Sequence, residues 1–153
     1  MSLPRLLRVM GVLMLAGGAL ALAEEASGPV QRVEIAKTLQ VLRAYEDDRL
    51  VFQSRISTGK WDRSTPNGHF TAGKKHRMHY SKRYHNAPMP FSVQVNGHVF
   101  IHGFTAVPAW PASHGCIRLP LDGANPAKWF FDWVRPGTPI EVGGRWEKPP
   151  PQR

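Results

Sequence analysis

The feature that most constrains the fold of this 153-residue chain is the segment 91–102, FSVQVNGHVFIH. Apolar and polar residues alternate along both halves of this segment, with the period of a β-strand. Asn96-Gly97 lies between the halves, and this dipeptide readily adopts the positive φ angles of a type I′ turn. The pattern therefore predicts a β-hairpin whose second arm ends at His102.

Alternating apolar residues predict further strands on both sides of the hairpin. They occur over residues 33–41 and 50–56, separated by the polar run 46–49, which predicts two strands joined by a turn. Residues 139–142 can form a last strand. We therefore expect a compact, mostly β domain, a sandwich of mixed sheets with one short helix.

The short helix is expected over residues 127–134. Asn125-Pro126 offers an N-cap residue and a first-turn proline, and the sequence RPG that follows the segment stops the helix. Trp129, Phe130 and Trp133 fall at helical spacing, so we expect them to pack in the core rather than to stack on a ligand.

Residues 74–85, KKHRMHYSKRYH, form a strongly basic segment without the period of a strand or a helix. We therefore expect a long surface loop, which would wall a groove that has Cys116 at one end. A solvated face is the default interpretation of such a charge run, and a surface that receives an anionic substrate is the alternative.

The first residues have the layout of a secretory signal peptide. Arg5 and Arg8 precede an apolar run over residues 9–22, and Ala21-Leu22-Ala23 offers a small-residue cleavage site. The apolar run is too short, and too rich in Gly and Ala, for a good membrane span. We therefore expect residues 1–23 to be removed and the mature chain to be exported, periplasmic and soluble.

The remaining chain is basic and long enough for one domain, which we place at residues 24–146, before a Pro-rich tail at 147–153. Without Arg5 and Arg8 it has 18 Lys and Arg against 11 Asp and Glu, a net charge of +7. Such a protein is attracted to anionic polymers of the cell wall. Export separates it from nucleic acid, so we expect no nucleic-acid partner.

Cys116 is the only cysteine of the chain, so no internal disulfide can form. An unpaired thiol in an exported protein is buried, paired with another chain or used chemically. Its surroundings, Ser113-His114-Gly115-Cys116 with His102-Gly103 upstream, favour chemical use. A nearby base stabilises the thiolate, and a glycine lets backbone N–H groups approach a developing oxyanion.

This ordered string resembles the motif of the L,D-transpeptidase catalytic domain, also called the YkuD family. The motif is an upstream His-Gly followed by Ser/Thr-His-Gly-Cys, and the resemblance extends over nearly all of the mature chain. Further segments that carry it are Ser57-Thr58-Gly59-Lys60, Thr65-Pro66-Asn67-Gly68-His69-Phe70, Asn86-Ala87-Pro88-Met89-Pro90-Phe91 and Gly137-Thr138-Pro139-Ile140.

The resemblance implies catalytic roles for four residues. Cys116 would attack an amide carbonyl of a peptidoglycan stem peptide, and His102 would be its general base. The backbone carbonyl of Gly103 would orient His102, as an aspartate does in serine hydrolase triads. His114 would line the site and assist proton transfer.

On the substrate side, the resemblance implies that the backbone amides of Gly115 and Cys116 form the oxyanion hole. Arg118 would hold a carboxylate of the peptide, because a planar two-pronged donor suits that group. The other residues expected to line the substrate site are Ser113, Met89 and Tyr84.

Two departures from the family's pattern concern the same region. Only ten residues separate His102 from Ser113, fewer than in many members, and Arg118 stands where some members have Asn. The shorter connection predicts a smaller lid and a more open cleft.

Several alternatives stay open. A zinc site built from His102, His114 and Cys116 uses common ligand types, but the spacing matches no usual metal signature, so we expect no metal and no cofactor. A non-catalytic wall-binding module would explain the charge but not the cysteine, and reaction of the thiol with a carbapenem would separate the two. Within catalysis, an amine acceptor gives 3-3 or 1-3 cross-links, whereas water gives an L,D-carboxypeptidase-type hydrolase. We expect a monomer.

Overall fold

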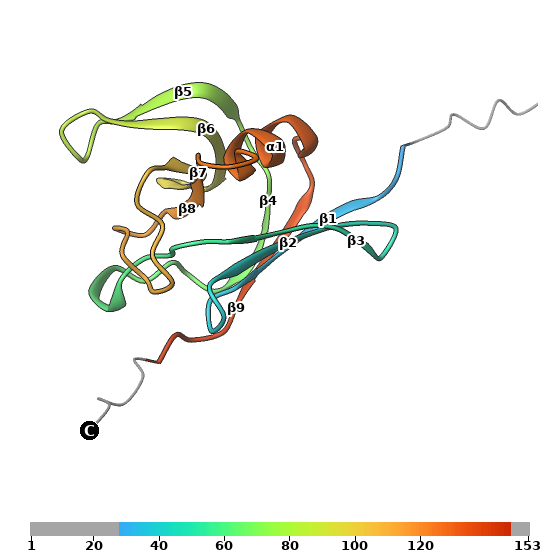
Figure 1. The fold of residues 1–153 in the computed structure, drawn as a ribbon, viewed down its shortest axis with the longest axis horizontal. Coiled ribbons are helices and arrows are strands. Elements are labelled where there is room, and N and C mark those ends of the chain that lie inside the picture. Colours follow the sequence, from blue (N-terminus) through green and yellow to red (C-terminus); the bar gives the residue numbers. More distant parts are fainter. Residues whose placement is uncertain (1–27, 148–153) are drawn as a thin grey trace, which may run out of the picture.

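The computed structural model describes residues 28–147, which fold into two β-sheets and one α-helix (Figure 1). One sheet has the strand order β3-β2-β1-β9-β4, and the other has the order β5-β6-β7-β8. The strands are β1 (Gln31–Ala36), β2 (Val41–Glu46), β3 (Arg49–Arg55), β4 (Gly68–Thr71), β5 (Lys75–Ser81), β6 (Ala87–Asn96), β7 (Val99–Phe104), β8 (Ile117–Pro120) and β9 (Pro139–Gly143). The expected mostly β fold with mixed sheets and one short helix is confirmed. The expected signal peptide lies outside the described residues, as does the Pro-rich tail apart from Glu147.

Both sheets contribute to a single hydrophobic core. Its members are side chains that point inward at alternate positions of the strands, together with the buried side of helix α1 (Pro126–Trp133). The largest fully buried apolar side chains are Ile35, Leu42, Ile56, Val93, Ile101, Ile117, Leu119, Phe130, Val134 and Ile140. Helix α1 packs against β6, β7 and β8 and so covers the inner face of the four-stranded sheet.

The first strands differ from the expectation. Residues 33–41 are not one strand: β1 and β2 form a hairpin whose turn contains Gln40, with a φ of 51°. Apolar residues continue to alternate through the turn, at Leu39 and Val41, so the sequence pattern does not reveal that the chain reverses here. Asp47 and Asp48, with φ angles of 47° and 64°, form the two-residue turn between β2 and β3. Two successive positive φ angles are the signature of a type I′ turn.

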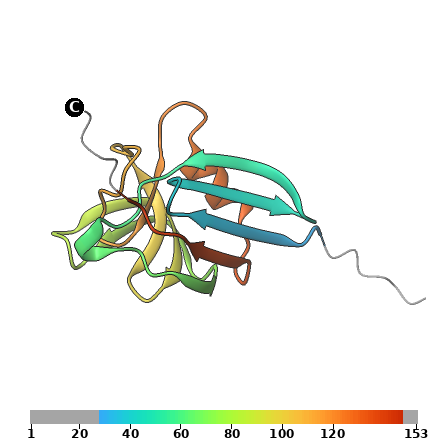
Figure 2. The same cartoon turned by 90° about the horizontal axis from the view of Figure 1, so that it is seen from below.

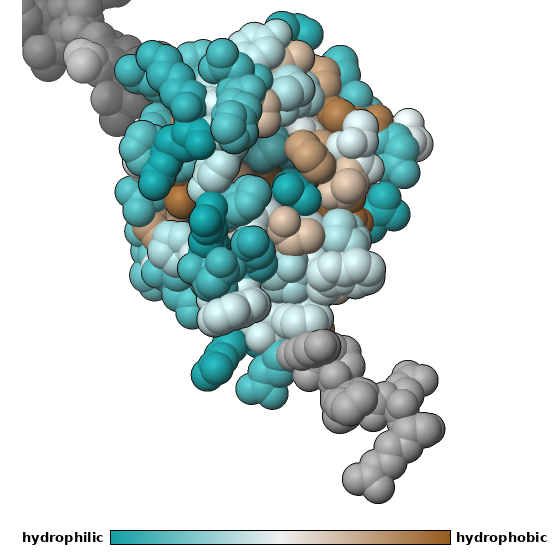
Figure 3. Space-filling model, turned by 90° about the vertical axis from the view of Figure 1, so that its left-hand side faces the viewer, coloured by the Kyte–Doolittle hydropathy of each residue, from teal (hydrophilic) through white to brown (hydrophobic). Residues whose placement is uncertain are grey.

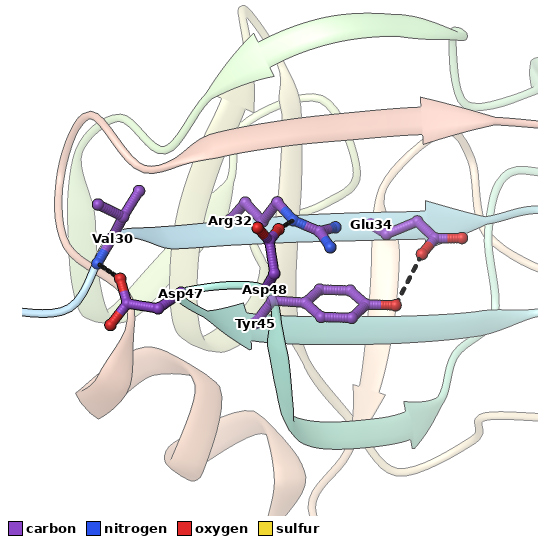
Figure 4. Close-up of polar contacts among 6 residues, drawn as sticks. All are labelled: Val30, Arg32, Glu34, Tyr45, Asp47 and Asp48. Atoms are coloured by element: carbon purple, nitrogen blue, oxygen red, sulfur yellow. Dashed lines mark hydrogen bonds and ion pairs between the residues drawn. The ribbon is translucent and has the colours of Figure 1, made fainter.

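The outer face of this sheet is a polar surface that holds the β2–β3 turn against β1 (Figure 4). The Asp47 carboxylate accepts a hydrogen bond from the Val30 N–H at 2.9 Å, and Arg32 donates to Asp48 at 3.3 Å. The Tyr45 hydroxyl donates to Glu34 at 3.1 Å. The five-stranded sheet therefore has one apolar face, toward the core, and one face in contact with solvent.

The hairpin over residues 91–102 is confirmed as β6 and β7, but its turn differs from the expectation. Asn96 pairs with Val99, so the turn residues are Gly97 and His98. Gly97 has a φ of 49°, whereas Asn96 does not have a positive φ. The register slips between Gln94 and Asn96, which moves the turn by one residue. Strand β7 continues to Phe104, so His102 lies inside the strand rather than at its end.

The expectation of a loop over residues 74–85 is wrong for most of the segment. Residues 75–81 form strand β5, which pairs antiparallel with β6 from Lys75 opposite Val93 to Ser81 opposite Ala87. β5 is an edge strand whose side chains are half-buried or exposed, so it needs no apolar alternation. Only residues 82–86 remain as a turn at the tip of this hairpin, with positive φ at His85 and Asn86.

Helix α1 and strand β9 confirm the remaining expectations. The Asn125 side chain caps the helix by accepting from the Lys128 N–H at 3.0 Å. Phe130 is fully buried, and Trp129 stacks on Phe52 of β3 with ring centroids 4.1 Å apart. β9 lies parallel to β1 and antiparallel to β4 (Figure 2). Among residues 28–147, no helix has the length and apolar character needed to cross a membrane.

Candidate active site

The alternation of side chains along β7 and β8 separates the candidate site from the core. These neighbouring strands are parallel, with Ile101 opposite Ile117 and His102 opposite Arg118. The two isoleucines are fully buried in the core. Because successive side chains point to opposite faces of a sheet, His102 and Arg118 lie on the other face, together with Cys116 immediately before β8.

A cavity of about 580 Å³ occupies this face. Eight of the nine expected site residues line it, and Gly103 does not. These eight are Met89, Tyr84, His102, Ser113, His114, Gly115, Cys116 and Arg118. The opposite wall comes from the β5–β6 hairpin, so part of the basic segment does wall the cavity, as a strand and a turn.

His102 is buried, with 5% of its surface exposed, and its tautomer follows from one contact. Its Nδ1 lies 2.9 Å from the carbonyl oxygen of Gly103. A carbonyl oxygen can only accept, so Nδ1 carries the proton and Nε2 keeps a free lone pair. Burial lowers the pKa of His102 to about 4, against the opposing effect of the Gly103 hydrogen bond and with smaller contributions from Arg118 and His79. The imidazole is therefore neutral at pH 7.

Cys116 is half-buried, and its thiol is also neutral at rest. Burial raises the pKa of the Cys116 thiol, while the backbone of Phe100 and the Arg118 guanidinium oppose this shift. The Sγ atom lies 3.6 Å from the carbonyl oxygen of His98, the acceptor of its weak hydrogen bond. The cavity thus combines a neutral thiol with a neutral imidazole, and a base must act on the thiol before it can attack.

Gly103 serves packing as well as the orientation of His102. A Cβ atom on Gly103 would lie 2.4 Å from Cδ2 of Leu121 and 3.1 Å from Cβ of Ala127 in α1. Only a glycine at this position lets the helix approach β7 so closely. Gly103 faces Leu121 and Ala127 in the core, and it therefore does not line the cavity.

The loop before β8 is shaped by its own hydrogen bonds. The Gly115 N–H donates to Oγ of Ser113 at 3.1 Å, and the Ser113 hydroxyl donates to the carbonyl of Cys116. Gly115 has a φ of 121°, a conformation that favours glycine. One of the two amides expected in the oxyanion hole, that of Gly115, is therefore engaged by Ser113.

A buried clamp formed by Lys37, Gly59 and Thr65 holds this loop, and sequence reasoning assigned these residues no role. The Thr65 hydroxyl donates to the Gly115 carbonyl at 2.8 Å and accepts from the Gly59 N–H at 2.9 Å. Lys37 in turn donates from Nζ to the carbonyl of Thr65 at 2.6 Å, and burial lowers the pKa of this lysine. Thr65 and Lys37 are 1% and 7% exposed, so this is an internal polar network.

Backbone contacts extend the clamp along residues 57–60. Ser57 and Arg118 exchange backbone hydrogen bonds of 3.1 and 2.9 Å, and the Lys60 N–H donates to the Ser113 carbonyl at 3.0 Å. Gly59 fits between two backbones: a Cβ atom there would lie 2.1 Å from the Arg63 carbonyl and 2.8 Å from Cα of Gly115. Residues 57–60 and 65–70 are two of the segments that resemble the family, and this resemblance was the only indication of the clamp in the sequence.

Tyr84 and His114 meet across the cavity. Their rings stack with centroids 4.6 Å apart, which brings the tip of the β5–β6 hairpin against the loop that precedes β8. Arg118 lies over the ring of Phe104 at 4.1 Å, which holds the guanidinium in place.

The lining of the cavity is cationic. Lys82, Arg83 and Arg118 line it, and no Asp or Glu is among its lining residues in the part of the chain that the structure describes. Such a cavity favours a ligand with carboxylates. Across residues 28–147, no three His, Cys, Asp or Glu side chains are grouped so that they could hold a metal ion.

Comparison with solved structures shows this fold in L,D-transpeptidases. An L,D-transpeptidase from Stackebrandtia nassauensis superposes with a TM-score of 0.70 at 24% identity, over 85% of this chain and 62% of that one. One from Xylanimonas cellulosilytica gives 0.66 at 28% identity, over 76% and 62%. L,D-transpeptidase 1 from Mycobacterium tuberculosis gives 0.62 at 28% identity, over 76% and 63%. The chain thus spans about three fifths of the length of these proteins.

Comparison at the level of sequence gives a family but no individual relative. No curated protein matches the chain. Residues 30–142 match the family described as L,D-transpeptidase catalytic domain, YkuD. This match covers most of the chain, including the cavity and both sheets, and the chain therefore belongs to the L,D-transpeptidase catalytic-domain family.

Proposed function

We propose that the protein is a cysteine-dependent L,D-transpeptidase that cross-links peptidoglycan stem peptides through an acyl-enzyme on Cys116. The observation that carries this proposal is the cationic cavity that Cys116 shares with His102 and Arg118. The thiol supplies a nucleophile, the free lone pair on Nε2 supplies a base, and the guanidinium supplies a carboxylate ligand.

The first half of the reaction forms the acyl-enzyme. His102 takes the thiol proton as the sulfur of Cys116 attacks the amide carbonyl of the donor peptide. The Cys116 N–H supports the developing oxyanion, because Ser113 already engages the amide of Gly115. The C–N bond then breaks, the leaving amine takes the proton from His102, and a thioester remains on Cys116.

The second half returns the enzyme to its resting state. An acceptor amine of another stem attacks the thioester and gives a proton to His102. The C–S bond breaks, the sulfur recovers the proton, and the new amide gives a 3-3 or a 1-3 link. Burial lowers the pKa of His102 to about 4, so the imidazole releases each proton readily but is a weak base toward the resting thiol.

The setting that we propose follows from the charge and the amino-terminal sequence. A basic, exported, periplasmic and monomeric protein would bind the anionic wall directly through its surface. The cationic lining of the cavity would then select stems that carry free carboxylates.

Intact-mass spectrometry of the mature protein with disaccharide-tetrapeptide muropeptides tests the proposal. We expect a transient adduct on Cys116 together with cross-linked dimers, and the linkage in the dimer identifies the bond that is made. Trimmed stems without dimers would assign the hydrolase instead. A folded protein that binds sacculi without adduct or product would assign a wall-binding module.

A further inference from the structure

The most exposed large hydrophobic side chain of residues 28–147 is an indole. Trp61 is 92% exposed and lies on the 3-10 helix η1 (Trp61–Arg63). Single exposed apolar residues are common on protein surfaces. Trp61 differs from them by its position, because η1 lies beside the loop that holds Cys116.

Two contacts tie η1 to the candidate active site. A Cβ atom added to Gly59 would lie close to both the Arg63 carbonyl and Cα of Gly115, so η1 and the Cys116 loop meet at this glycine. The Lys60 N–H donates to the Ser113 carbonyl at 3.0 Å, which holds residue 60 against the loop before β8. Burial lowers the pKa of His114, and the cations of Arg63 and Lys60 lower it further. In Figure 1, η1, the loop before β8 and the tip of the β5–β6 hairpin lie on the same side of the molecule.

Polar side chains flank the exposed indole. Asp62 makes long ion pairs with Lys60 and Arg63, at 4.0 and 3.9 Å, and all three side chains are 38–49% exposed. Such loose, solvated pairs contribute little to stability, so these groups are available to a ligand. Trp61 therefore offers a flat apolar ring, and its sequence neighbours Lys60, Asp62 and Arg63 offer hydrogen-bonding groups.

The surrounding surface favours a polar ligand over a protein partner. Figure 3 shows this side of the molecule, where hydrophilic side chains cover most of the surface and hydrophobic ones gather toward its right-hand part. A stable protein–protein interface needs an apolar centre, and a single exposed ring does not supply one.

We propose that Trp61, with Lys60, Asp62 and Arg63, forms a subsite for an N-acetylated sugar of the glycan strand. This inference rests on the proposed function, since that glycan is covalently joined to the stem peptide in the cavity. The C–H face of a pyranose ring stacks on the indole, and its hydroxyl and acetamide groups hydrogen-bond to the flanking side chains. The subsite gives sugar-linked stems an advantage over free peptides.

The first test compares two substrates that differ only in the sugar. KM is measured for a disaccharide-tetrapeptide and for the same tetrapeptide without the disaccharide. The wild-type protein should show a KM about 3- to 10-fold lower for the sugar-linked form, the size of one aromatic contact. Trp61→Ala should bring the ratio of the two KM values to about one, and Trp61→Phe should retain part of it.

Trp110 supplies the matched control. It is a second exposed indole, at 56%, beside the same segment, where its carbonyl accepts from the Ser57 hydroxyl at 2.7 Å. Trp110→Ala should keep the wild-type ratio. A wild-type ratio of one, or the same ratio in wild type and Trp61→Ala, would overturn the subsite.

A second measurement requires no turnover. Calorimetric titration of the Cys116→Ala protein with tetra-N-acetylchitotetraose should show binding that the additional Trp61→Ala change abolishes. If this binding is found but no variant turns over either substrate, the subsite stands and the proposed transpeptidase function falls. Turnover without any binding or sugar preference would remove the subsite and leave the enzyme.

Discussion

The two sheets of this protein contribute differently to the candidate site. The four-stranded sheet carries His102 and Arg118 on its strands and places Cys116 at the start of β8. The five-stranded sheet contributes no residue to the cavity lining. The connection between its strands β3 and β4 instead holds the Cys116 loop through Gly59 and Thr65. Chemistry and positioning thus come from opposite layers of one core, and substitutions in the two layers should differ in what they change.

The largest effect is expected from Cys116→Ala. Loss of the nucleophile should reduce turnover of tetrapeptide stems by ~10³-fold or more, as for nucleophiles of other acyl-transfer enzymes. The thiol is half-buried and makes one weak hydrogen bond, so the midpoint of thermal unfolding should stay within a few degrees. Retained activity would refute the proposed mechanism.

His102→Gln is the next test of the four-stranded sheet. Removing the base should lower kcat by roughly 10²- to 10⁴-fold. Because the resting thiol is already neutral, its alkylation by iodoacetamide at pH 7 should change little. A strong fall in alkylation together with kcat would instead indicate a preformed thiolate–imidazolium pair.

The same histidine predicts how stability depends on pH. Its folded pKa is about 4, below its unfolded value of about 6.5, so the neutral form is favoured by folding. The stabilisation is fully present above pH 6.5 and is lost as the pH falls toward 4, by up to about 3 kcal/mol. Urea unfolding of wild type and His102→Gln at pH 7 and 4.5 measures this difference. Parallel losses in the two proteins would contradict it.

Thr65→Val tests the positioning layer. It removes the hydroxyl that bonds Gly115 and Gly59, which should lower the free energy of unfolding by about 1–3 kcal/mol and kcat by about 10-fold. Thr38→Val, in the turn between β1 and β2, is the matched control, because its hydroxyl donates to the Arg145 carbonyl at an exposed site. Equal kcat values for Thr65→Val and Thr38→Val would contradict a positioning role of Thr65.

Arg118→Ala should change substrate binding and not kcat. Loss of one carboxylate ligand should raise KM about 10-fold. The rate of thiol alkylation at pH 7 should change less, because burial and not Arg118 dominates the pKa of Cys116. If the two losses were equal, the guanidinium would act on the thiol rather than on the substrate.

The sequence predicted best where neighbours along the chain determine the structure. The hairpin over residues 91–102 and the helix that begins after Asn125 depend on local alternation, turn residues and capping. The strand over residues 75–81 escaped prediction because an edge strand beside a cavity is ordered by backbone pairing, not by apolar side chains. The turn at Gly97-His98 was missed because a register slip in β6 shifts it.

The candidate site likewise has a part that the sequence predicted and a part that it did not. The motif from His102 to Cys116 occupies fifteen consecutive residues, and eight of the nine expected residues line one cavity. The hydrogen bonds of the clamp join residues that are far apart in sequence, such as Thr65 and Gly115 with a separation of 50. No local pattern predicts such a contact, because a buried threonine has the same sequence neighbours with or without its partner.

The position of β9 between two other strands has a consequence for the order of folding. β9 lies between β1 and β4, and Gln31 and Thr138, 107 residues apart, share a buried hydrogen bond next to it. The five-stranded sheet therefore cannot close until nearly all of the described chain is available. Contacts of such long sequence separation make folding slow. A growing or translocating chain would reach residue 143 while β1 and β4 still lack their common neighbour, so the five-stranded sheet is completed last.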